Sequence, residues 1–139
     1  MIASVKDLIR YIPQREPMVM IHGLEEVSEQ HAVTFLHIFS TNIFVKEGKL
    51  REPGLIENIA QSAAVQAGYL CIKNGIPVTV GFIARIKKLE IMEFPPVNVD
   101  IQTTISITNN VFDMSMVTGE IFWREKLICH CEMTIFIKK

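Results

Sequence analysis

Glu57 stands near the start of the stretch REPGLIENIAQSAAVQAGYL (51–70), where small and aliphatic residues predominate. Gln61 follows one helical turn later, so both side chains would lie on the same side of a helix. A carboxylate beside an apolar site could exchange a proton with a bound molecule, and Gln61 could orient either the carboxylate or that molecule. The backbone N–H groups near Gly54 and Leu55, at the helix start, could bind a carbonyl oxygen. The alternative is an ordinary exposed residue, placed where the helix dipole favours negative charge.

Acid–base chemistry at Glu57 needs a second titrating group. His22 is the best reserve candidate for proton transfer. The histidines of the chain all fall in strand-like segments, where a lone histidine is most often structural or exposed: His22, His31, His37 and His130.

The composition predicts one ordinary globular domain over 1–139. The chain is 49% hydrophobic and 21% charged, which allows a sizeable core. Its formal net charge of −1 gives no general attraction to nucleic acid or to an anionic membrane. The first residues carry charges and form no continuous apolar segment, so neither a signal peptide nor a membrane span is expected. The predicted compartment is the cytoplasm.

Three cysteines, an odd number without the spacing of a disulfide framework, predict reduced thiols. The sequence Cys129-His130-Cys131 suggests a metal site, but in a strand the two thiols point to one face and the histidine to the other. Structural zinc sites need about four convergent ligands. No metal and no cofactor are therefore expected.

The order of elements along the chain is two strands, one long helix and four strands. A short helix is predicted over 5–12, ended by Pro13. The first two strands are predicted over 18–28 and 31–40, and the long helix opens at Pro53 and Gly54. The later strands are predicted over 78–91, 97–108, 111–123 and 126–137. Turn residues connect them at Pro95-Pro96, Asn109-Asn110 and 124–126.

A single apolar helix amid six strands must bury itself, and a curved antiparallel sheet wrapped around it does so. At about 100° per residue, one side of the helix collects apolar residues: Ile56, Ile59, Ala60, Ala63, Ala67 and Leu70. The other side collects Asn58, Ser62 and Gln66. Between them, the row Glu57, Gln61, Ala64 and Gly68 is polar at its start and then nearly empty of side-chain bulk. This row could line a narrow channel for an elongated apolar ligand, and the fold class is α+β.

Four blocks of the sequence resemble the hotdog-fold 3-hydroxyacyl-[acyl-carrier-protein] dehydratases. YIPQREPMVMIHGL (11–24) resembles their opening, Leu-Pro-His-Arg-Tyr-Pro followed by a hydrophobic strand. ENIAQ (57–61) matches Glu-Ala-Met-Ala-Gln at the head of their central helix. GFIARIKKLEIMEFPPVNVDIQTTI (81–105) is similar to their third and fourth strands, and EIFWREKLICHCEMTIF (120–136) resembles their closing hairpin. The resemblance covers nearly the whole chain and implies a hotdog fold, an antiparallel six-stranded sheet wrapped around one long central helix.

The resemblance implies chemistry on 3-hydroxyacyl thioesters in fatty acid or pigment biosynthesis. In typical members a histidine of a His-Phe-Pro-Gly motif works with the helix carboxylate across a dimer interface to remove water. Here the sequence more closely resembles a divergent subgroup of aryl polyene and flexirubin-type pigment pathways, in which an Asn-x-Phe segment replaces that motif. The loop before the helix, STNIFVKEGKLREPG (40–54), contains no histidine. Glu57 and Asn42 are then the implied catalytic residues. The Asn42 amide can hold a water or a carbonyl group but cannot act as a base near neutral pH. Two alternatives stay open: an acyl thioesterase, or a catalytically reduced partner subunit of an active hotdog dehydratase.

The resemblance also implies contacts with a substrate and with partners. Hotdog enzymes commonly pass the acyl chain along the third strand, which implies substrate binding at Gly81, Phe82 and Ile83, together with Gln61, Gly54 and Leu55. Candidates for docking the acidic face of an acyl carrier protein are Arg85, Lys87 and Lys88, with Lys73 and Arg51. The alternative for these basic residues is a solvated strand face. Because hotdog proteins pair their third strands across a two-fold axis, a homodimer or a heteromer with a second hotdog subunit is expected.

Overall fold

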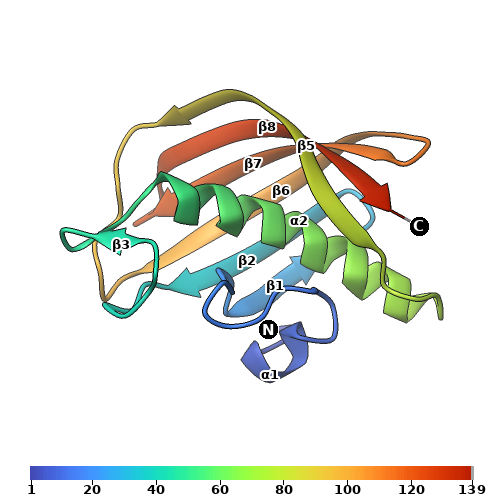
Figure 1. Cartoon of the computed structure of the whole chain (residues 1–139), viewed down its shortest axis with the longest axis horizontal. Helices are drawn as coiled ribbons and strands as arrows, with labels where there is room; N and C mark the ends of the chain where they lie inside the picture. The colour runs from blue at the N-terminus through green and yellow to red at the C-terminus, as the bar shows by residue number, and fades with distance from the viewer. Residues whose placement is uncertain (139) are drawn as a thin grey trace.

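Within residues 1–138, which the computed structural model describes, six strands form one antiparallel sheet that curves around a long helix (Figure 1). In chain order the elements are α1 (Val5–Leu8), β1 (Gly23–Val27), β2 (His31–His37), β3 (Val45–Lys46), β4 (Lys49–Leu50), α2 (Glu52–Lys73), β5 (Val80–Ile91), β6 (Asp100–Val111), β7 (Met114–Trp123) and β8 (Lys126–Lys138). The strand order is β1-β2-β6-β7-β8-β5, so β1 and β5 are the edges of the sheet. The predicted α+β arrangement is confirmed. Neither helix in this part of the chain is long and apolar enough to cross a membrane.

The first predicted strand begins later than expected, because side chains of α2 bind the backbone before it. Asn58 donates to the Met20 carbonyl oxygen over 2.8 Å, and the Met20 N–H donates to Gln61 Oε1 over 2.7 Å. These backbone groups are therefore unavailable to a strand partner, and β1 starts at Gly23 instead of residue 18. The helix predicted over 5–12 is also shorter, since α1 ends at Leu8.

The turn predicted at Asn109-Asn110 is wrong. Both asparagines pair with β7 inside β6, after a register shift that follows Ile107. The chain reverses instead at Phe112, whose φ of 54° lies in the left-handed region that a tight turn requires. The predicted turn at 124–126 is confirmed, because Arg124 and Glu125 have φ values of 54° and 63°.

The small hairpin of β3 and β4 lies in a segment for which the sequence predicts no strand. Its two strands pair through Val45 with Leu50 and Lys46 with Lys49. Glu47 and Gly48 form the turn, with φ values of 56° and 76°. This hairpin occupies the loop immediately before α2 and sets where the helix begins.

The polar side of α2 packs against the sheet, which corrects the predicted orientation of the helix. Asn58, Ser62 and Gln66 are all buried, whereas Ile56, Ala60 and Ala67, on the predicted buried side, are only partly buried. Asn58 accepts a hydrogen bond from the Thr103 hydroxyl, and Ser62 Oγ lies 2.6 Å from Thr34 Oγ1. Gln66 donates to the carbonyl oxygens of Ser28 and Glu29 over 2.9 and 3.1 Å. We call the side chains of Asn58, Ser62, Gln66, Thr34 and Thr103 the polar seam.

The polar seam determines how the helix is rotated. Buried hydroxyl and amide groups are costly without partners, so α2 adopts the rotation in which the sheet and the N-terminal segment provide them. Ile59 remains in the core, where its side chain occupies the space over Gly119 that a larger residue would need. The same rotation turns the small residues Ala60, Ala64 and Ala67 away from the sheet centre and towards β5.

Candidate active site

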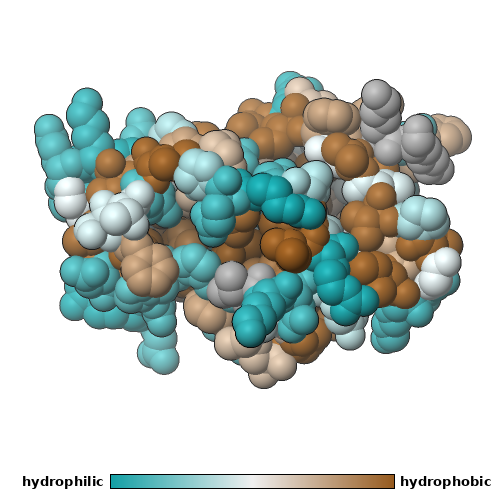
Figure 2. Space-filling model, turned by 60° about the horizontal axis from the view of Figure 1, so that its bottom comes forward, coloured by the Kyte–Doolittle hydropathy of each residue, from teal (hydrophilic) through white to brown (hydrophobic). Residues whose placement is uncertain are grey.

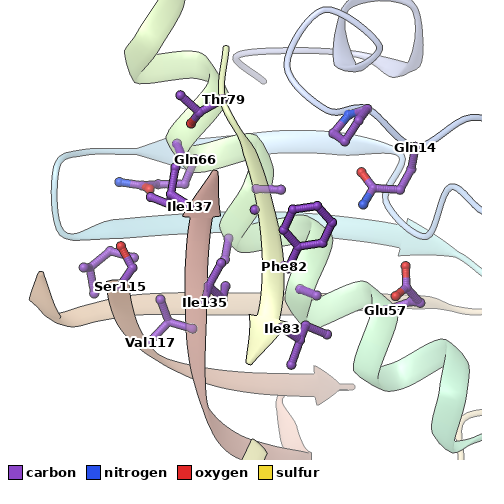
Figure 3. Close-up of a pocket in the computed structure, with 17 residues that line it drawn as sticks. Gln14, Glu57, Gln66, Thr79, Phe82, Ile83, Ser115, Val117, Ile135 and Ile137 are labelled. Carbon is purple, nitrogen blue, oxygen red and sulfur yellow. The ribbon is translucent and has the colours of Figure 1, made fainter. Parts of the chain in front are cut away.

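A cavity of about 280 Å³ lies beside α2, between the helix, the loop after α1 and the beginning of β5 (Figure 3). Aliphatic side chains of β7 and β8 close its far side, among them Val117, Ile135 and Ile137. Apolar residues also gather on the surface towards one end of the molecule (Figure 2, right), where β5 begins and the β6–β7 turn lies. A mostly apolar cavity with a few polar groups is typical of sites that bind small apolar molecules.

Glu57 lines this cavity, and Gln61 holds its carboxylate. Gln61 Nε2 donates to Glu57 Oε1 over 2.9 Å and also to the Met18 carbonyl oxygen over 2.8 Å. Gln61 Oε1 accepts the Met20 N–H, so the amide is fixed through both of its ends. Gln61 is buried and does not itself line the cavity. Gln61 therefore orients Glu57, and of the two side chains only Glu57 lines the cavity.

The predicted channel row is only partly present. Ala64 lines the cavity together with Ala60, Ala63 and Ala67, so small side chains do form its helix wall. Gly68 instead faces the carbonyl oxygen of Tyr11, which leaves no room there for a Cβ atom. The channel therefore follows the alanine side of α2, next to the predicted row.

The third of the predicted strands is β5 in the structure. Its three predicted substrate-binding residues all line the cavity: Gly81, Phe82 and Ile83. In Figure 3, Phe82 and Ile83 project from β5 towards the side on which Glu57 lies. Because β5 is an edge strand, Phe82 is 52% exposed and Ile83 is 37% exposed. The wall opposite the alanines is therefore also the open edge of the sheet.

Three other predicted site residues do not line the cavity: Asn42, Gly54 and Leu55. The Asn42 amide accepts the Phe44 N–H over 2.9 Å and lies 3.3 Å from Met20 Sδ, so it organises its own loop. The N–H groups of Gly54 and Leu55 both donate to the Arg51 carbonyl oxygen, over 3.0 and 3.2 Å. These groups already have partners in the fold and do not provide free donors for a carbonyl oxygen of a ligand.

His22 lies just before β1 and does not line the cavity. Its Nδ1 accepts the backbone N–H of His37 over 3.0 Å, and its ring packs edge-on against Phe39. Burial lowers the pKa of His22, although the nearby Glu16 carboxylate partly opposes this change. The imidazole is therefore neutral at neutral pH and acts as a hydrogen-bond acceptor. Glu57 is the one titratable side chain among the described residues that line the cavity.

The predicted docking residues Arg85, Lys87 and Lys88 are exposed on β5, the strand that also carries the cavity wall. Lys88 Nζ lies 3.1 Å from Glu132 Oε2 on the neighbouring strand β8, so its charge is partly compensated.

The cysteines of β8, Cys129 and Cys131, are buried, whereas His130 is 3.2 Å from Glu90 on the other face. The predicted alternation of this segment is thus confirmed.

Sequence reasoning missed Gln14, which lines the cavity from the loop between α1 and β1. In the sequence this residue belongs only to the block 11–24, which resembles the opening of the dehydratases, and no period along the chain connects it with Glu57. The closeness of the two residues arises from the tertiary packing of that loop on α2.

The fold is that of a hotdog protein, with a mostly apolar cavity beside its central helix. A family model described as "ApeP-like: ApeP dehydratase" matches residues 6–139. The chain therefore belongs to the ApeP-like dehydratase family. No curated protein has significant sequence similarity to the chain.

Solved structures share this fold at low sequence identity. A chain of the dehydratase heterocomplex ApeI:P from Xenorhabdus doucetiae has a TM-score of 0.89 at 16% identity, covering 95% of this chain and 91% of that one. An HP0420 homologue from Helicobacter felis has a TM-score of 0.71 at 11% identity, covering 100% and 93%. A hypothetical thioesterase from Streptococcus pneumoniae TIGR4, crystallised with coenzyme A, has a TM-score of 0.67 at 12% identity, covering 84% and 87%. These likenesses establish the hotdog fold.

Proposed function

We propose that this chain is a subunit of a hotdog dehydratase that removes water from 3-hydroxyacyl thioesters, with Glu57 as its proton-transfer residue. The observation that carries the proposal is the position of Glu57, a carboxylate held by Gln61 at a cavity whose other walls are largely aliphatic. The alanine wall of α2 and the β5 wall would bind the acyl chain. The thioester end would then lie near the carboxylate.

The reaction needs two proton transfers. A base removes a proton from the carbon next to the thioester carbonyl, and an acid protonates the hydroxyl group on the following carbon, which leaves as water. The products are an enoyl thioester and one water molecule. Glu57 can serve in one of these transfers, and the described cavity residues include no second titratable group. We therefore assign the second transfer to a partner subunit.

The edge strand β5 supports a partner subunit. Apart from Ile86 and Ile91, its residues are exposed, and they include the large apolar side chains of Phe82, Ile83 and Leu89. A long apolar edge tends to pair with another strand. Pairing with the same strand of a second hotdog subunit would bring that subunit's residues to the wall formed by Gly81–Ile83. The Xenorhabdus doucetiae protein, which belongs to a dehydratase heterocomplex, is consistent with such an assembly.

We assign the thioester to an acyl carrier protein, which would dock on the exposed Arg85 and Lys87. Charge reversal of both residues should weaken carrier binding steeply at low salt, because attraction between exposed charges is screened by ions. Charge reversal of Lys46 and Lys49, two exposed residues of the β3–β4 hairpin, is the matched control. Equal effects of the two double variants would refute this docking site.

Mass spectrometry of carrier-bound 3-hydroxyacyl substrates tests the proposed reaction directly. Short, long and aryl substrates are incubated with the full chain, alone and together with a second hotdog subunit. We expect loss of one water, and a decrease of about 100-fold or more in Glu57→Gln, as for removal of a general acid or base. Glu52→Gln is the matched control, because Glu52 is exposed in the first turn of the same helix.

The products distinguish the alternatives. Release of a free carrier thiol would assign thioester hydrolysis in place of dehydration. No turnover by a folded complex, or full activity of Glu57→Gln, would refute the role of Glu57 and leave the chain as a non-catalytic partner subunit.

A further inference from the structure

The thioester carbonyl needs a hydrogen-bond donor that the helix start does not provide. When the neighbouring carbon loses its proton, negative charge develops on the carbonyl oxygen, and a fixed donor at that oxygen lowers the barrier. The N–H groups of Gly54 and Leu55 are bound to the Arg51 carbonyl oxygen. A donor supplied by this chain would therefore lie among the polar groups that line the cavity.

Gln14 is one of these polar groups. It lines the same cavity as Glu57, and Figure 3 shows the two side chains entering from the loop after α1 and from α2. In that view, the amide nitrogen of Gln14 is on the side towards Glu57 and its amide oxygen is turned away. A carboxamide does not titrate near neutral pH, so Gln14 could donate a hydrogen bond without competing for the proton of Glu57.

The amide of Gln14 is not accounted for by the packing of the chain alone. Its Oε1 atom is buried and has no hydrogen-bond partner among the described residues. A buried acceptor without a partner is costly, so a side chain serving only the fold would be better replaced by an apolar one. The cost is understandable if the other end of the amide binds a ligand.

The loop that carries Gln14 is held in place on both sides. Arg15 Nη1 donates to the carbonyl oxygens of Ile12 and Gln14, each over 2.8 Å. Tyr11 and Ile12 are buried, and the backbone of Tyr11 packs directly on Gly68 of α2. The amide of Gln14 is therefore positioned relative to the helix that carries Glu57 before a ligand binds, as electrostatic stabilisation of a transition state requires.

We propose that Gln14 Nε2 donates a hydrogen bond to the thioester carbonyl oxygen of the bound acyl group and stabilises the negative charge that develops there. This inference rests on the proposed dehydratase function and names the residue that would bind the reacting carbonyl. Gln14 is then a substrate-binding residue, and Glu57 remains the group that moves the proton.

The first test uses a ligand that cannot be dehydrated. A saturated acyl-pantetheine thioester, labelled with ¹³C at its carbonyl, is bound to the full chain and observed by NMR. A hydrogen bond moves a carbonyl resonance downfield, so we expect a downfield shift with the natural protein. The shift should be largely lost in Gln14→Met, although the ligand still binds. Gln30→Met is the matched control, because Gln30 is exposed in the turn before β2 and should keep the shift.

Unfolding experiments separate this role from a purely structural one. Since Gln14 Oε1 has no partner in the described fold, Gln14→Met should unfold at the same or a higher denaturant concentration than the natural protein. A clear loss of stability would instead indicate a structural amide and would overturn the inference. If Gln14→Met does not fold, Gln14→Glu has the same shape without the N–H donor and allows the same NMR comparison.

Kinetics provide the second test. A donor that strengthens in the transition state affects kcat more than KM, so kcat for dehydration should fall on the order of 100-fold in Gln14→Met. An unchanged kcat, or an unchanged carbonyl shift, would overturn the inference while leaving the dehydratase function intact. A Gln14-dependent shift in a protein without dehydratase activity would support the inference and refute the proposed reaction. Absence of acyl binding would refute both.

Discussion

The buried hydroxyl pair of the polar seam allows a quantitative test of how α2 is held on the sheet. Ser62 Oγ donates to the Asn58 carbonyl oxygen over 2.7 Å, and it lies 2.6 Å from Thr34 Oγ1. A serine hydroxyl has one proton, so Thr34 must be the donor in the contact between the two side chains. Both side chains are fully buried. Removing Ser62 Oγ therefore leaves the Thr34 hydroxyl without its acceptor.

The structure predicts that the two substitutions are not additive. Ser62→Ala should lower the free energy of unfolding by about 1–3 kcal/mol, the cost of a buried polar group without its partner. Thr34→Val keeps the shape of the side chain and should cost about 1 kcal/mol, the net value of one hydrogen bond. The double variant leaves neither hydroxyl, so its cost should fall below the sum by at least about 0.5 kcal/mol, a coupling energy typical of contacting residues.

Urea unfolding, followed by the fluorescence of Trp123, measures the three variants against the natural protein. The exposed pair Ser40→Ala and Thr41→Val is the matched control and should show costs near zero that add. Costs of Ser62→Ala and Thr34→Val that add to within about 0.3 kcal/mol would refute the assigned hydrogen bond. The rotation of α2, and with it the position of Glu57, would then have to depend on the apolar contacts alone.

Two further predictions concern titratable groups. Burial lowers the pKa of His22, so the unfolded chain binds a proton more readily than the fold does. The contribution of neutral His22 to the free energy of unfolding is therefore present above about pH 6.5, the ordinary histidine pKa, and is lost as the pH falls below it. His22→Asn, which retains a hydrogen-bond acceptor, should make the decrease in urea midpoint between about pH 7.5 and 5.5 less steep. An equally steep decrease in that variant would show that His22 is not the group responsible. Burial also raises the pKa of Cys129 to about 12 and that of Cys131 to about 11. Iodoacetamide at neutral pH should therefore modify the partly buried Cys71 in the folded protein, but Cys129 and Cys131 only after unfolding. Peptide mass spectrometry measures this labelling. Rapid labelling of Cys129 in the folded protein would contradict its burial in β8.

Local residue patterns were sufficient for the architecture. Alternation along 97–108, turn residues at 124–126 and a lone apolar helix among strands predicted an α+β fold with a wrapped sheet. These patterns succeed because each depends on neighbours within one strand, one turn or one helix. Local patterns also identified Glu57 and Gln61 as candidate site residues, whereas the family resemblance added the β5 residues Gly81–Ile83. The structure brings Glu57 and these β5 residues to one cavity.

The failures concern groups whose partners lie far along the chain. Asn58, Ser62 and Gln66 form the polar side of the helix, opposite the apolar side, yet each is buried with a partner on a strand, in the N-terminal segment or in the β1–β2 turn. Hydropathy counts such residues as polar, whereas their burial depends on whether a distant donor or acceptor meets them. The resulting rotation of α2 moved the channel from the predicted row to the alanine side.

The sequence by itself determined the long helix and the six main strands of this protein, their order, and the candidate carboxylate Glu57 near the head of that helix. Only the tertiary structure decided what that carboxylate works with. Folding took the N–H groups of Gly54 and Leu55 into the helix start, used Asn42 to organise its own loop, and placed Gln14 at the cavity that Glu57 lines. The physical reason is twofold. A hydrogen-bonding group is available to a ligand only when the fold has not already satisfied it, as local partners do at Gly54, Leu55 and Asn42. Which of the remaining groups reach a common cavity depends on packing between segments distant in sequence.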